Sequence, residues 1–140
     1  MANAVYNAGK KVLLQNDWVA GDYRVLLVSS SYTPDIDAHT SVSDITNELS
    51  GTGYSRKTLS GKALTTDNTN DRVGGFADNV TWTAMNAGTP AGAVLYLEGA
   101  SDAARKLIAY IDFTDTASNG GDWTLKWNNQ SSNGEVFRAA

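Results

Sequence analysis

Apolar residues alternate over short stretches of the chain, and the most telling stretch is residues 23–29. Val25 and Leu27 would lie on one face of a strand there, with Leu26 and Val28 on the other. A strand that is apolar on both faces must be covered on both faces. We therefore expect this strand in the centre of the domain, with the other elements arranged around it.

A long polar excursion, Ser31 to Gly53, separates this strand from a second one expected over residues 54–59. Pro34 removes a backbone N–H and fixes φ, which ends the first strand. The glycines at 51 and 53 can take the left-handed conformation that ends a helix. The arrangement of strand, excursion and strand indicates a rigid display element and not a catalytic loop.

Within the excursion, Ser41 and Asp44 have the spacing of a capping box, in which each residue bonds the backbone of the other. This spacing predicts a short helix that runs from there to about Leu49. Ile45 and Leu49 are four residues apart and would lie on the same side of that helix.

Further strands are expected in the second half of the chain, separated by turns rich in Gly, Asn, Asp and Ser. The clearest alternation covers residues 79–85, where Val80, Trp82 and Ala84 should face inward. Three more strands are expected: residues 91–98; residues 106–113, with Leu107, Ala109, Ile111 and Phe113 on one face; and residues 123–127, with Trp123, Leu125 and Trp127 on one face. Residues 63–66 and 135–138 would add two short strands.

Seven or eight short strands at intervals of about 10 to 15 residues predict an all-β chain that forms a sandwich or barrel. We expect one antiparallel, jelly-roll-like β domain over residues 1–140, with one or two short helices. Residues 1–18 are an N-terminal arm or a short helix in this interpretation. Val5, Ala8, Gly9, Val12 and Leu13 are roughly helix-spaced, although Gly9 disfavours a helix.

The composition narrows the classes of function. The net charge is −4 and the sequence pI is near 4.7, so the surface would repel a phosphate backbone and we expect no nucleic-acid partner. The sequence has no run of about 18 apolar residues, so we expect no membrane span. The first residues lack the basic-then-apolar order of a secretory signal. Cysteine is absent, which excludes disulfides and thiolate metal sites.

Two groups of side chains have the types of ligand atom that a metal ion binds. Asp35, Asp37 and His39 would project from one side of an extended segment and could hold a divalent ion. Residues 67–71 with Asp78 have the oxygen-rich composition of a calcium loop, but Arg72 replaces the glycine of the EF-hand pattern. A solvated turn explains both groups better, so we expect no metal and no cofactor.

Catalytic arrangements are equally weak in the sequence. A Ser-His-Asp triad could use only His39, the single histidine, and no nucleophile elbow accompanies it. Asp35 and Glu48 could act as paired acids on a glycoside, but nothing fixes their separation. The sequons at Asn79 and Asn129 are attributed to chance. We therefore expect no catalytic residue and no enzyme.

The four tryptophans could form a platform that stacks on sugars. Trp82, Trp123 and Trp127 fall on the apolar sides of their strands, which favours a place in the core. Trp18 lies beside a turn and outside any clear pattern, so we expect it to be the aromatic residue most exposed at a contact.

Several segments together resemble a family of small structural proteins of tailed-bacteriophage virions. The densest likeness is Ser-Tyr-Thr-Pro-Asp-x-Asp-x-His over residues 31–39, continuing to Tyr54. Similar segments cover nearly the whole chain: Tyr-Arg-Val-Leu-Leu-Val-Ser at 23–29, residues 67–72, Asp-Asn-Val-Thr-Trp at 78–82, Leu-Ile-Ala-Tyr-Ile-Asp-Phe at 107–113, and Asn-Gly at 119–120.

The resemblance implies a capsid decoration, or cement, protein that is made in the host cytoplasm and resides on the capsid exterior. It implies binding to the major capsid protein and a homo-oligomer, either a trimer or a dimer, without catalytic residues. A tail- or baseplate-associated role, including carbohydrate binding, is the first alternative, and a small hydrolase using Asp35, Asp37 or His39 is the second. The contact parts would be the arm up to about Trp18 and the excursion from Ser31 to Gly53.

Overall fold

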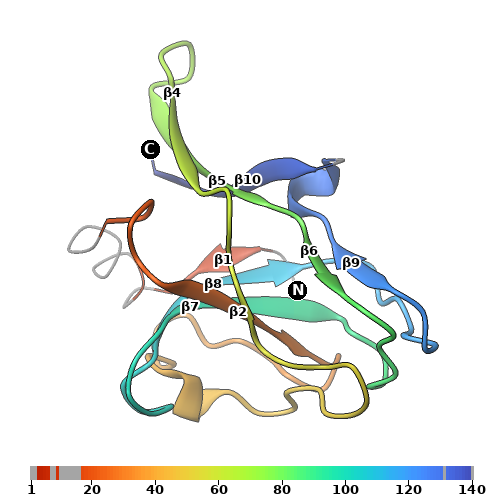
Figure 1. The fold of residues 1–140 in the computed structure, drawn as a ribbon. Coiled ribbons are helices and arrows are strands. Elements are labelled where there is room, and N and C mark those ends of the chain that lie inside the picture. Colours follow the sequence, from red (N-terminus) through yellow and green to blue (C-terminus); the bar gives the residue numbers. More distant parts are fainter. Residues whose placement is uncertain (1–2, 7–8, 10–16, 131, 140) are drawn as a thin grey trace.

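The computed structural model describes residues 3–6, 9, 17–130 and 132–139, which form strands joined by turns and loops (Figure 1). Two single turns of 3-10 helix accompany the strands in this part of the chain. The elements are β1 (Ala4–Val5), β2 (Tyr23–Val28), η1 (Val42–Asp44), β3 (Lys57–Thr58), β4 (Ala63–Asp67), β5 (Arg72–Asp78), β6 (Val80–Trp82), β7 (Gly92–Leu97), β8 (Lys106–Asp112), β9 (Trp123–Leu125), η2 (Trp127–Asn129) and β10 (Asn133–Ala139).

The strands form two layers. One layer is a five-stranded sheet in the order β1-β8-β7-β2-β3, and the other combines the β10-β5-β4 sheet with the β6-β9 pair. Every strand pairing within them is antiparallel. Figure 1 shows β5 leading directly into β6 above the larger sheet. These antiparallel sheets packed together confirm the prediction of a mainly β sandwich with short helices.

Strand β2 is buried on both faces, as its sequence predicts. It pairs with β7 over its full length, from Tyr23 opposite Leu97 to Val28 opposite Gly92, and with β3 at two positions. Val25 and Leu27 point between the layers, while Leu26 and Val28 point to the opposite face. Two hydrophobic cores therefore form on either side of the larger sheet.

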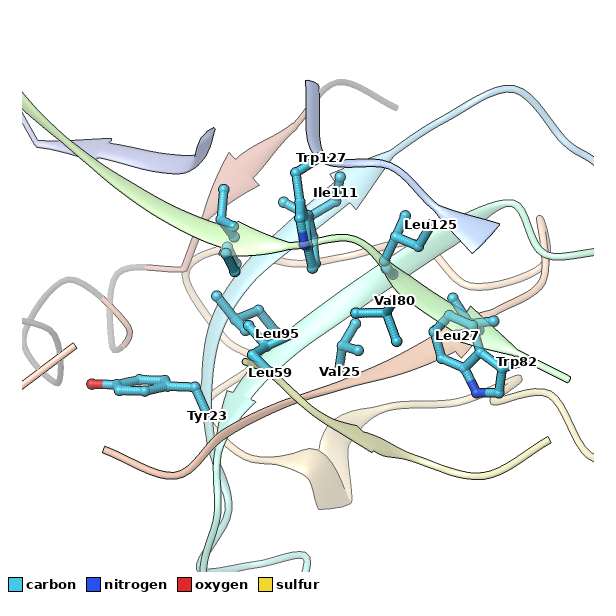
Figure 2. Close-up of a cluster of buried hydrophobic side chains, with 14 of the residues drawn as sticks. Tyr23, Val25, Leu27, Leu59, Val80, Trp82, Leu95, Ile111, Leu125 and Trp127 are labelled. Carbon is cyan, nitrogen blue, oxygen red and sulfur yellow. The ribbon is translucent and has the colours of Figure 1, made fainter. Parts of the chain in front are cut away.

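The main core lies between the two layers (Figure 2). Its largest members are Trp82 and Trp127, both fully buried. Each indole N–H donates to a backbone carbonyl: that of Trp82 to Ser55 O at 2.7 Å and that of Trp127 to Asp78 O at 2.8 Å. The prediction that the tryptophans of the second half belong to the core is confirmed.

The second core lies under the excursion. Its members come from β2, β7, β8, the excursion and the residue after β1. They are Tyr6, Leu26, Val28, Tyr32, Val42, Val94, Tyr96, Leu107 and Tyr110. In Figure 1 the excursion runs along the face of the larger sheet that points away from β5 and β6. It therefore acts as a third, irregular layer over that face.

The prediction of a helix that reaches Leu49 is wrong. The capping spacing does start a turn, since Asp44 Oδ2 accepts the backbone N–H groups of Thr40 and Ser41 at 2.8 and 3.0 Å. The turn ends after Asp44 because residues 47–49 return to pair beside β2, where Leu49 N donates to Leu27 O at 2.9 Å. Ile45 packs on the second core and Leu49 lies in the first, so they do not share a side.

Two predictions of side-chain direction are also wrong. The β7–β8 register shifts between Leu95, which pairs with Ala109, and Tyr96, which pairs with Leu107. The extra residue is Ile108, and this bulge sends Leu107 to the second core, while Ala109 stays in the main core. Ala84 is exposed because the strand ends at Trp82 and the chain turns, with Ala84 at φ 50°.

The expected arm or helix at residues 1–18 falls largely outside the described residues. In the part that is described, Ala4 and Val5 form strand β1 against Tyr110 and Ala109 of β8. Asn3 Oδ1 accepts the backbone N–H of Asp112 at 2.6 Å. Residues 3–6 are thus an edge of the larger sheet.

Candidate interaction surfaces

The excursion between β2 and β3 is fixed to the sandwich at several points. At its end near β2, Ser29 N donates to Asn47 O at 3.1 Å. In its middle, Leu107 N donates to Thr40 O at 3.1 Å and Val42 N donates to Arg105 O at 2.9 Å. Near its second end, Asn86 N donates to Thr52 O at 2.7 Å. A segment without regular secondary structure is therefore held as a defined surface.

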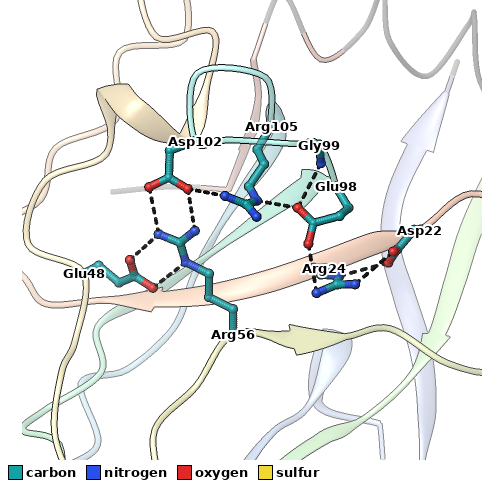
Figure 3. Close-up of polar contacts among 8 residues, drawn as sticks. All are labelled: Asp22, Arg24, Glu48, Arg56, Glu98, Gly99, Asp102 and Arg105. Atoms are coloured by element: carbon teal, nitrogen blue, oxygen red, sulfur yellow. Dashed lines mark hydrogen bonds and ion pairs between the residues drawn. The ribbon is translucent and has the colours of Figure 1, made fainter.

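A row of alternating charges ties the excursion to β2 and to the β7–β8 connection (Figure 3). Arg56 is at its centre and bonds both Glu48, at 2.7 Å, and Asp102, at 2.7 Å. Asp102 also bonds Arg105, at 2.7 Å. The row continues from Arg105 to Glu98, and from Glu98 through Arg24 to Asp22.

The row shifts the pKa values of several of its members. The hydrogen bonds from Arg56 hold the pKa of Asp102 below its ordinary value, and the bonds to Glu48 and then to Asp102 raise the pKa of Arg56. The pKa of Glu98 is lowered first by the Gly99 N–H and then by Arg105. Burial raises the pKa of Tyr54, whose hydroxyl donates to Glu48 at 2.8 Å. These carboxylates are committed to structure and are poorly suited to acid–base catalysis.

Asp35 and His39 of the considered metal group make hydrogen bonds within the excursion. Asp35 Oδ1 accepts the backbone N–H groups of Asp37 and Ala38 at 3.1 and 3.0 Å, which caps the turn. His39 Nδ1 faces the hydroxyl of Tyr32 at 2.9 Å and the N–H of Asp35 at 3.2 Å. Over the described residues, no group of three His, Cys, Asp or Glu side chains gathers in a way that could hold an ion.

The oxygen-rich segment 67–71 is a turn held by its first aspartate. Asp67 Oδ1 accepts the N–H groups of Thr69 and Asn70 at 3.1 and 3.2 Å, and its other oxygen lies 3.2 Å from Arg72 Nε. Asp78 is engaged elsewhere, since it accepts from Asn133 Nδ2 at 3.0 Å. The structure therefore does not bring the two halves of the considered calcium site together.

The residues considered for catalysis are also separate. Glu48 is bound to Arg56 and Tyr54, whereas Asp35 caps its own turn. Asn79, considered as a sequon, bonds the backbone with both ends of its amide: Nδ2 to Gln130 O at 2.9 Å and Oδ1 to Trp127 N at 3.2 Å. Its side chain therefore has a structural role.

The expectation that Trp18 is exposed at a contact is wrong. Its side chain is buried and packs on Tyr23 and edge-on against Phe137, with both ring centroids 4.8 Å away. Its indole N–H donates to Phe76 O at 3.3 Å. All four tryptophans are between 0% and 8% exposed, so the chain offers no tryptophan face on which a sugar could stack.

The β4–β5 hairpin projects from the sandwich, as Figure 1 shows for β4 and the loop above it. Four of the five β4 residues are exposed, and Leu64 has 52% of its surface accessible. Strand β4 pairs with β5 alone in the part of the chain that is described. Strand β4 buries little in the isolated chain, so the β4 side of this hairpin is the second candidate contact element beside the excursion.

One hollow opens where the edges of the two layers face each other, beside β1, β8, η2 and β10. Its volume is about 420 Å³, and apolar side chains of Val5, Trp127 and Phe137 contribute to its lining. The charged residues at this hollow, Glu135 and Arg138, bond each other. The hollow suits an apolar contact and has no converging acids.

Sequence reasoning missed the charge row centred on Arg56, because its members are far apart in the chain and no local spacing marks them. No protein-family model, curated protein or solved structure matches this chain. In the described segments, no helix has the length and apolar character that a membrane crossing requires.

Proposed function

We propose that the chain is a non-enzymatic structural protein of a tailed-phage virion, which decorates the capsid and clamps neighbouring major capsid subunits from outside. The observation that supports this most is the excursion at residues 31–53. The same segment carries the densest resemblance to the family and is fixed by backbone bonds and by the charge row. A fixed irregular layer is suited to a protein contact because little conformational entropy is lost on binding.

The clamp works through the number of contacts. Each copy touches more than one capsid subunit, so individually modest contacts add to a strong attachment. The excursion and the β4–β5 hairpin are the contact elements in this proposal. A trimer or dimer of the chain would match the symmetry axes of a shell.

A matched pair of surface substitutions tests the proposal. Ile36 lies on the excursion and Val19 lies outside it, with 38% and 49% of their surfaces exposed. Ile36→Asp should weaken binding to purified shells that lack the protein by about tenfold, whereas Val19→Asp should leave it unchanged. Sedimentation of shells with increasing protein gives the two affinities.

Failure of the wild-type protein to bind shells, with the protein found instead in tails or in no particle fraction, would reject the capsid assignment. Deletion of residues 2–10 is a poorer test of the arm, because it removes the fully buried Tyr6. Loss of binding in that deletion would not separate a contact role from a folding defect.

A further inference from the structure

Three side chains, Tyr6, Tyr32 and His39, connect the end of β1 to the excursion. The Tyr6 and Tyr32 hydroxyls are 2.8 Å apart, and the Tyr32 hydroxyl is 2.9 Å from His39 Nδ1. Tyr6 is fully buried and Tyr32 is 4% exposed, while His39 is partly open to solvent. Water therefore reaches this row of hydrogen bonds at the imidazole end.

The backbone N–H of Asp35 fixes the direction of the row. It can only donate, and it points at His39 Nδ1 at 3.2 Å, so that nitrogen carries no proton. The Tyr32 hydroxyl then shares the single lone pair of that nitrogen as a second and shorter donor, which leaves its oxygen to accept the hydrogen of Tyr6. With a neutral imidazole, every hydrogen in the row has an acceptor.

We propose that His39 is a pH-operated latch, in which protonation of Nδ1 releases residues 35–39 from Tyr32 and loosens the connection to strand β1. A protonated Nδ1 cannot accept from Asp35 or from Tyr32. If Tyr32 turns to accept from the imidazolium, the buried hydroxyls of Tyr6 and Tyr32 hold one hydrogen for which the described residues provide no acceptor. The closed arrangement is therefore specific for the neutral ring.

The charged groups near the imidazole lie on its own turn and on η1. Backbone N–H groups chiefly lower the pKa values of Asp35 and Asp44, and His39 adds to both shifts, while Asp37 lies on the same turn as His39. The groups that face the row from β1 and β8 are Tyr6 and Tyr110, whose pKa values are raised chiefly by burial.

Asp112 and Asp115 on the β8 side act on Tyr110 and add to the rise of its pKa. Tyr6 and Tyr110 therefore stay neutral while the imidazole changes charge. Histidine is the residue type that changes charge between about pH 5 and pH 8, and the row contains one histidine.

The test uses the full chain and needs no partner. Because the protein has one histidine, its imidazole nitrogen resonances are assigned without ambiguity. At pH 7.5 we expect the tautomer with the proton on Nε2. Between pH 7.5 and pH 5.5, hydrogen exchange at residues 32–40, corrected for the intrinsic rate, should accelerate by at least about tenfold along the imidazole titration.

His39→Asn is the matched variant, since the asparagine oxygen can replace Nδ1 as an acceptor and does not titrate. It should remove the acceleration. Tyr32→Phe provides a second variant, in which exchange at residues 35–39 is already fast at pH 7.5. An Nδ1–H tautomer at pH 7.5, a titration without faster exchange, or equal acceleration in wild type and His39→Asn would overturn the latch. The inference holds whether or not the chain binds a capsid.

Discussion

At the scale of single residues, Arg56 connects the excursion to the β7–β8 connection. It holds two carboxylates from separate parts of the chain, and its side chain is 26% exposed. Arg56→Met should lower the free energy of unfolding by about 1–2 kcal/mol, because Glu48 and Asp102 lose their shared donor while water still reaches them. Urea denaturation at pH 7 measures the change.

The matched control is Arg138→Met, which removes an arginine whose side chain is 52% exposed and which bonds one carboxylate, Glu135, in the described part of the chain. That substitution should change the free energy of unfolding by less than about 0.5 kcal/mol. Equal effects at the two arginines would show that the charge row adds nothing beyond an ordinary surface pair.

Two glycines with positive φ separate backbone strain from a steric clash. A Cβ on Gly53 (φ 75°) would lie 2.5 Å from the backbone oxygen of Ala84, whereas a Cβ on Gly120 (φ 89°) would have nothing within 4 Å. Gly53→Ala should therefore cost more than about 2 kcal/mol and Gly120→Ala about 1 kcal/mol. Thermal denaturation compares them, and equal losses would mean that the clash relaxes at no cost.

At the scale of elements, the exposed side chains of β4 should contribute little to the stability of the isolated chain. Leu64→Asp should change the free energy of unfolding by less than about 0.5 kcal/mol because Leu64 is largely exposed. Leu125→Ala, at a 3% exposed position of the main core, should cost about 2–5 kcal/mol. A large loss in Leu64→Asp would place the hairpin among the stabilising elements.

The alternation of apolar and polar residues predicted the strands whose pairing is regular. It failed where pairing with a distant segment changes the register or replaces the expected element. The two-faced burial of β2 could be read directly from its residues. The bulge at Ile108 could not, because it depends on the register with β7. Leu49 bonds Leu27 of β2 and does not continue a helix, and the local capping residues cannot predict this contact between distant residues.

At the scale of the whole molecule, stability should fall in acid. The folded chain lowers the pKa values of Asp22, Glu98 and Asp102, chiefly through hydrogen bonds from Arg24, the Gly99 N–H and Arg56. Depressed folded-state values stabilise the fold above the unfolded pKa of about 4, and this contribution is lost as pH falls from about 5. Urea midpoints at pH 7, 4 and 3 should decrease in that order.

The variant Arg56→Met provides the comparison for this pH series. Without the arginine, the pKa of Asp102 should move back toward its ordinary value, so stability should depend less steeply on pH below 5 than in the wild type. Parallel pH dependences in the two proteins would contradict the assignment of acid sensitivity to the charge row.

The candidate surfaces were only partly predictable. The excursion was identified from its length and polarity, and the structure adds the hydrogen bonds and ion pairs that hold it on the sandwich. The hairpin formed by residues 63–76 depends on how the two layers stack. The burial of Trp18 does too, because Trp18 packs on Tyr23 from one layer and on Phe137 from the other. Sequence patterns do not contain such packing between distant segments.

The pairing of Ala4 with Tyr110 has a consequence for synthesis on the ribosome. In the described part of the chain, strand β1 pairs with β8 alone, so Ala4 and Val5 are made more than a hundred residues before their pairing partners. The nascent chain can close β2 onto β7 before β8 exists, and β1 can join the sheet only afterwards.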